Sequence, residues 1–200
     1  MPFLYNENEA IKAKLGGLTV TDGNDPLGRA VPVRFRAPEQ ELADEVFPAI
    51  VIDEANWSVD PERAHSGYVP LPYTPEGYAA PDPGSWLFTQ MPLPLNVDWT
   101  VTLYCRKSLH RTALLGQLGT FPYLPGRLGF LQVPQDGTLR RLEVIGGPTT
   151  DSVLDGQGKR LLTAVWRIRT TGELIWAPID PVTETTSIDL TVSPIGPAGI

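Results

Sequence analysis

Proline and glycine restrict what this chain can fold into more than any other feature of its sequence. Of its 200 residues, 21 are proline and 19 are glycine, and proline alone is at about twice its usual share of roughly 5%. Proline has no backbone N–H, so it interrupts helices and central strands. The composition therefore predicts a β-rich chain with long, stiff connections, and the length favours a single domain over residues 1–200.

Eight of the prolines fall between residues 57 and 96, where the regular apolar pattern is lost. Aromatic residues are interspersed with them, among them Tyr68, Tyr73, Tyr78 and Trp86. Disordered linkers are poor in aromatic residues, and a loop this long inside a compact domain usually has a function. We interpret 57–96 as a Pro-rich insertion arm that packs on another surface, such as a neighbouring subunit, and 194–200 as a loose C-terminal tail.

Outside the arm, strand and helix periodicities can be followed. Residues 6–15 and about 108–118 are expected to be helices. Period-two alternation or β-branched runs predict strands at 31–35, 50–52, 97–105, 130–133, 138–145, 162–168 and 188–192. Pro32 makes the first of these an edge strand or the start of a strand. This order predicts an α+β fold, a mostly antiparallel sheet with one or two helices packed on one face.

The strand at 97–105 runs almost directly into the helix at 108–118, and Cys105 and His110 lie at this junction. Cys105 falls on the same strand face as Trp99 and Leu103, and a lone cysteine on a buried face is usually a small core residue. A nucleophilic cysteine instead needs an accessible, electropositive setting and a base. Junction residues are therefore expected to be scaffold, and a thiol-dependent enzyme using Cys105 and His110 is kept as an alternative of another class.

Four side chains are expected to form the apolar stripe of that helix, with His110 near it: Leu114, Leu115, Leu118 and Phe121. Trp99, Val101, Leu103 and Leu118 are expected to be buried against one another.

Other motifs give no catalytic, cofactor or metal site. The two histidines, His65 and His110, have no metal-ligand spacing. Acidic residues near 151–155 lack the calcium-loop pattern. The stretch DGQGKRLL at 155–162 has Arg160 where a phosphate loop needs Ser or Thr, and a strand follows it where that loop needs a helix.

The formal net charge is −7, which argues against a protein that grips nucleic-acid phosphates. Arg140 and Arg141 are accordingly interpreted as paired surface charges or as part of a subunit contact. The first fifteen residues do not have a signal-peptide pattern, and no run approaches the roughly 18 apolar residues of a membrane span. One cysteine favours a reducing compartment.

The order of these elements resembles the tail terminator and tail completion proteins of tailed bacteriophages, also called tail-to-head joining or neck proteins. The resemblance covers about residues 29–176 and lies in these stretches: VPVRFRAPE, FPAIVI, MPLPLNVDWTVTLYCR, SLHRTALLGQLGTF, LPGRLGFLQVPQDGTLRRLEVIGG and LLTAVWRIRTTGEL. It implies a curved sheet with helices on one face. It also implies a hexameric ring in the virion that caps the tail tube and joins it to the neck.

That resemblance implies the chain itself, the tail tube protein and neck or connector proteins as partners, with DNA passing through the lumen without specific binding. The protein would be made in the host cytoplasm. The expected assembly interface comprises Tyr68, Tyr73, Tyr78, Trp86, Arg140 and Arg141. Two alternatives stay open besides the thiol enzyme: a baseplate or tail-sheath adaptor, and a soluble module that binds a small ligand.

Overall fold

The computed structural model describes residues 5–22, 25–35, 47–71, 74, 77–83, 85–124, 129–135, 137–154 and 158–183. Within them the chain is mostly β, as its composition predicted, and has two helices. The helices are α1 (Tyr5–Leu15) and α2 (Ser108–Leu118). The strands are β1 (Thr19–Asp22), β2 (Asp25–Ala30), β3 (Val33–Phe35), β4 (Ala49–Val59), β5 (Tyr68–Pro70), β6 (Ser85–Gln90), β7 (Leu93–Cys105), β8 (Gly129–Val133), β9 (Thr138–Leu154), β10 (Arg160–Leu174) and β11 (Asp180–Thr183).

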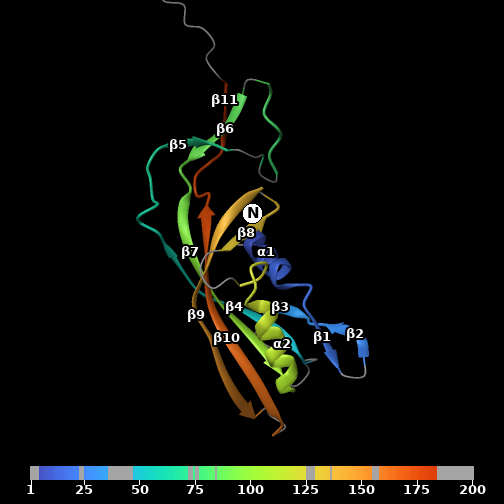
Figure 1. Cartoon of the computed structure of the whole chain (residues 1–200). Helices are drawn as coiled ribbons and strands as arrows, with labels where there is room; N and C mark the ends of the chain where they lie inside the picture. The colour runs from blue at the N-terminus through green and yellow to red at the C-terminus, as the bar shows by residue number, and fades with distance from the viewer. Residues whose placement is uncertain are drawn as a thin grey trace, which may run out of the picture.

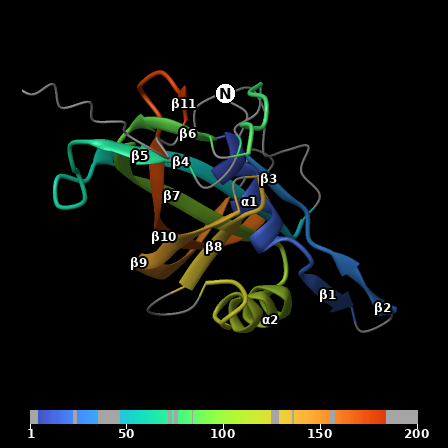
Figure 2. The same cartoon turned by 90° about the horizontal axis from the view of Figure 1, so that it is seen from above.

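Six strands form the main sheet, in the order β3-β4-β7-β10-β9-β8. β3 pairs with β4 in parallel, and the other neighbours are antiparallel. The long central strands β7 and β10 pair along their whole common length, from Leu162 opposite Cys105 to Leu174 opposite Leu93. The sheet curls, so its two edge strands approach the same helix, α1 (Figures 1 and 2).

The core lies on the concave face of this sheet. Alternate residues of β7 are buried there, as the period-two pattern predicted: Val97, Trp99, Val101, Leu103 and Cys105. The matching face of β10 is also buried, at Leu162, Ala164, Trp166 and Ile168. Trp99 is central: its indole N–H donates to Thr170 Oγ1 at 2.9 Å, and its ring lies 6.4 Å from that of Phe35.

Both helices cover the concave face. α2 has the predicted bounds and buries His110, Leu114 and Leu118, which confirms the expected burial of Leu118. The expectation for Phe121 is wrong, because its side chain is 70% exposed. The helix ends at Leu118, and Gly119 caps it by donating its N–H to the Leu115 carbonyl, so residue 121 no longer follows the helical stripe.

Pro32 directly precedes β3, which is an edge strand, as predicted. The Pro32 carbonyl accepts the Ile50 N–H at 2.9 Å, starting the parallel pairing. The strand predicted in FPAIVIDEANWSV, around residues 50–52, is β4, which ends at Val59; only its first part is buried, because the residues after Asp53 are exposed. β1 and β2 form a separate hairpin beside α2. The strand predicted at 188–192 and the tail at 194–200 lie outside the described residues.

The arm contains regular structure that the sequence did not reveal. β4 ends at Val59 and β7 begins at Leu93, so the connection between them is shorter than the predicted 57–96. Inside it, β5 and β6 pair antiparallel, and β11 adds to the other side of β6. This three-stranded sheet lies beyond one end of the main sheet (Figure 1).

Candidate assembly surfaces

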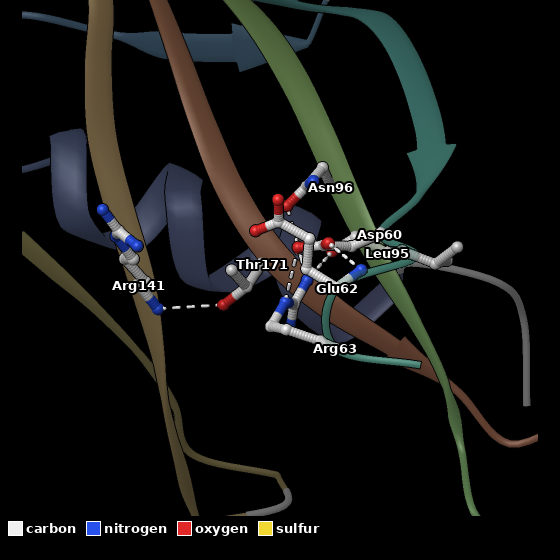
Figure 3. Close-up of polar contacts among 7 residues, drawn as sticks. All are labelled: Asp60, Glu62, Arg63, Leu95, Asn96, Arg141 and Thr171. Atoms are coloured by element: carbon white, nitrogen blue, oxygen red, sulfur yellow. Dashed lines mark hydrogen bonds and ion pairs between the residues drawn. The ribbon is translucent and has the colours of Figure 1, made fainter. Parts of the chain in front are cut away.

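The start of the arm is anchored to the main sheet by Arg63. Its Nε donates to Asp60 Oδ2 at 2.7 Å, and its Nη2 donates to the Leu95 carbonyl at 2.9 Å and to Asn96 Oδ1 at 3.3 Å. Asp60 also caps the turn, because its Oδ1 accepts the Glu62 N–H (Figure 3). The hydrogen bond from Arg63 lowers the pKa of Asp60. The chain therefore leaves β4 through a fixed turn.

The far end of the arm is tied to the C-terminal strand. The Met91 N–H donates to Gly67 O at 2.7 Å, closing the β5–β6 pair. The Trp176 indole N–H donates to Met91 O at 3.1 Å, and the Thr89 hydroxyl donates to Ala177 O at 3.4 Å. Residues 176–183 thus fix the orientation of the three-stranded sheet.

The two faces of this sheet differ. One face buries Leu87 and Thr89 of β6, next to the buried Leu71. Directly opposed residues of antiparallel strands share a face, and on the other face Tyr68 lies opposite Gln90, Pro70 opposite Phe88, and Val182 opposite Trp86. On this outer face Tyr68 is 71% exposed, Trp86 53% and Val182 45%.

We define the arm face as Tyr68, Pro70, Trp86, Phe88 and Val182. An exposed set of contiguous apolar side chains is typical of an interaction site, and aromatic residues are enriched at such sites. The structure thus places two of the predicted interface residues, Tyr68 and Trp86, on the same face of this sheet. Tyr78 is 46% exposed on the connection between β5 and β6, and Tyr73 lies outside the described residues.

Arg140 and Arg141 point to opposite faces of β9. Arg140 is buried on the concave face, with Nη1 3.2 Å from Glu173 Oε2. Arg141 is exposed and forms an ion pair with Glu143, and its backbone N–H donates to Thr171 Oγ1 (Figure 3). The structure therefore does not bring these arginines together with the arm face.

The convex face of the main sheet presents paired charges. Arg169 of β10 donates to both carboxylate oxygens of Asp98 on β7, at 2.6 and 2.9 Å, and this hydrogen bonding raises the pKa of Arg169. Glu143 lies opposite Arg169 on the next strand. Arg169 and Arg141 on this face are thus matched by carboxylates, which weakens their attraction for phosphate.

Cys105 is fully buried at the end of β7. Burial raises the pKa of its thiol to about 12, although Arg111 acts in the opposite direction. At neutral pH the group is therefore the neutral thiol and not the nucleophilic thiolate. This agrees with the prediction of a core residue.

Within the described residues, no group of three or more His, Cys, Asp or Glu side chains is placed to hold a metal ion. Over the same part of the chain, no helix has the length and apolar character needed to cross a membrane.

Neither a protein-family model nor a curated protein matches this chain. Among solved structures 13 chains match. One is the sheath/tube terminator of an extracellular contractile injection system, called PVC, determined by cryo-EM in the extended state. The similarity has 14% sequence identity and a TM-score of 0.40, and covers 100% of this chain and 66% of that one. This chain thus spans just under two thirds of that terminator's length.

The density of prolines and aromatic residues singled out Tyr68 and Trp86, which lie on the arm face, but it did not single out Val182 on that face or Trp176, which helps to hold the sheet. Both lie in or near β11, about ninety positions further along the chain than β6. A four-residue strand has too few positions to show an alternating pattern. The only local signal was Pro181 beside two β-branched residues.

Proposed function

We propose that this protein is a structural subunit of a phage-like tail, and that it forms a ring at the end of the tail tube where the tube meets the neck. The observation that supports this most directly is the arm face. Tyr68, Trp86 and Val182 are exposed together on a sheet that is anchored at both its base and its C-terminal strand. Such a face suits a permanent protein partner, because ordering it costs little on binding.

The ring is six-fold by the family resemblance given above. In it, the arm of one copy contacts the next copy or the neighbouring tube protein, a heterologous arrangement that closes by rotation. With a net charge of −7, the acidic residues are biased toward the lumen, where like charge keeps passing DNA from adhering. The tail tube protein and the neck proteins are the partners.

Electron microscopy of purified particles tests this proposal. We expect density for the protein as a closed ring at the head-proximal end of the tube. A position outside any ring, or a lumen lined mainly by Arg and Lys, contradicts the proposal.

A thiol-enzyme function is tested separately by Cys105→Ser. An assembly protein with this substitution is expected to reach particles in amounts close to wild type, because the thiol is buried in the core. Loss of nearly all activity from an otherwise folded variant would support the enzyme.

A further inference from the structure

A groove of about 790 Å³ lies between α1, β3 and the end of β8. Its floor is apolar and is formed mainly by Ala10 and Ala13 of α1 and by Val31, Val33 and Phe35 at the strand edge. Lys12, Glu9 and Gln135 also line it, and Gln135 Nε2 donates to Glu9 Oε2 at 3.0 Å. The groove follows from the curl of the sheet, because β3 and β8 are its two edges and α1 contacts both (Figure 2).

The core is incompletely covered at this groove. Val33 and Phe35 pack against the core cluster but are only half-buried. β3 is the end strand of the sheet order and pairs with β4 on one side. Among the described residues, no strand pairs with its other side. An open edge beside an apolar floor is the geometry that accepts an added strand.

The chain contains a segment that suits this site. Residues 187–193, SIDLTVS, alternate Ile188, Leu190 and Val192 with polar residues. A strand built from them presents three apolar side chains to one face.

We propose that residues 187–193 of a neighbouring copy add as a strand beside β3 and place Ile188, Leu190 and Val192 in the groove. The inference rests on the proposed ring, and it names the contact that joins one subunit to the next. Each copy gives its segment to one neighbour and receives one from the other, the head-to-tail pattern that closes into a ring.

The length of the connection favours a neighbour over the same chain. β11 ends at Thr183, and only residues 184–186 separate it from the segment. Four residue steps span at most about 14 Å. β11 lies beyond one end of the main sheet, beside β6, whereas β3 lies away from that end, next to the β1–β2 hairpin (Figure 1).

Peptide binding tests the groove. The receptor is the full chain with Ile188→Asp and Leu190→Asp, so that its own segment cannot compete, and the probe is a fluorescent peptide of residues 184–194. We expect saturable binding by fluorescence anisotropy. Val33→Asp in the receptor should weaken it at least ten-fold, while Leu139→Asp, an exposed apolar residue elsewhere, should leave it unchanged.

The peptide supplies a matched control on its own strand. Thr191→Asp in the peptide changes the face that points away from the groove and should retain binding, whereas Ile188→Asp with Leu190→Asp should abolish it. Absence of saturable binding, or equal effects of the two peptide changes, overturns the proposal.

Cysteine pairing identifies the donor. Chains carrying Lys12→Cys are mixed with chains carrying Asp189→Cys and oxidised. A disulfide-linked dimer that needs both chains supports exchange between copies. If the doubly substituted chain forms only an internal disulfide, even at high protein concentration, the segment occupies its own groove and the proposal is wrong.

These results are separable from the ring itself. If the peptide does not bind while microscopy still places the protein in a ring at the tube end, the docking is wrong and the proposed function stands. If the peptide binds but particles contain no such ring, the groove is real and the function needs revision.

Discussion

The main sheet and the three-stranded arm sheet differ in how their apolar side chains are covered. The main sheet buries its apolar face under two helices of its own chain, and Trp99 at its centre is 1% exposed. The arm sheet covers one face at Leu87 and Thr89 but leaves Trp86, between them and the turn, 53% exposed. β6 and β7 follow each other along the chain and each carries a tryptophan. Only the tryptophan of β7 is covered by the rest of the chain.

This difference suggests that the two sheets contribute differently to the stability of the fold and to the proposed assembly. Buried apolar area stabilises the fold in proportion to what leaves water, so the main sheet provides the stability of the molecule. The arm face holds apolar area that is still in water, and in the proposed assembly a partner covers it. The four predictions below test this division.

Trp99→Ala is expected to have the largest effect, a loss of about 3–5 kcal/mol in the free energy of unfolding. The substitution leaves a cavity beside Phe35 and removes the hydrogen bond to Thr170. Urea denaturation measures it. Trp57→Ala, on the exposed part of β4, is the control and should cost far less; a loss below about 1 kcal/mol for Trp99 would show that it is not a core residue.

Leu87→Ala is expected to cost about 2 kcal/mol within the arm sheet, with a smaller effect on the main sheet. Hydrogen exchange separates the two, because the Leu71 amide bonds to Leu87 O in the arm while amides of β10 report on the main sheet. Equal loss of protection in both places would mean that the two sheets unfold as one unit.

Trp86→Ala is expected to change the free energy of unfolding by no more than about 0.5 kcal/mol, because its side chain is largely exposed. Incorporation into particles should nevertheless fall. Leu154→Ala removes a side chain that is 72% exposed on β9 and should assemble normally. A Trp86 variant that is both stable and fully incorporated would remove the arm face from the interface.

Asp60→Asn is expected to have the smallest effect on the free energy of unfolding, and this effect should depend on pH. The pKa of Asp60 is lowered in the folded state by Arg63, so its contribution is fully present above the ordinary value of 3.8. It is lost as pH falls through the lower folded value. Stability should therefore change less between pH 5 and pH 3 in the variant than in wild type, with Asp82→Asn as the control; identical pH profiles would show that the turn contributes nothing.

The sequence was most informative where the pattern that determines burial lies within a single strand or helix. β7 and β10 are long, and the alternation of Val97 to Cys105 and of Leu162 to Ile168 predicted which face would be covered. Pro32 predicted an edge, because a missing N–H has the same consequence in any sheet. The bounds of α2 followed from apolar spacing alone.

Features that depend on distant partners were not predicted. β5, β6 and β11 are three to six residues long, and their pairing joins segments that are far apart in the sequence. The separation of Arg140 from Arg141 is different, because consecutive residues of a strand point to opposite faces, so it already followed from the strand predicted at 138–145. The predicted burial of Phe121 was wrong for a local reason: the helical periodicity was extended past the end of α2, where Gly119 caps the helix.

The late position of β11 sets an order of events during synthesis. β6 ends at Gln90 and β11 begins at Asp180, which is 180 − 90 = 90 positions later. At about 5–20 residues per second, the ribosome needs about 5–20 s to make that stretch. Until then the β5–β6 hairpin has no third strand and is marginal by itself, so Trp86 and Val182 cannot yet lie side by side. The complete arm face, with Val182 beside Trp86, therefore forms only after β7 to β10 have been made.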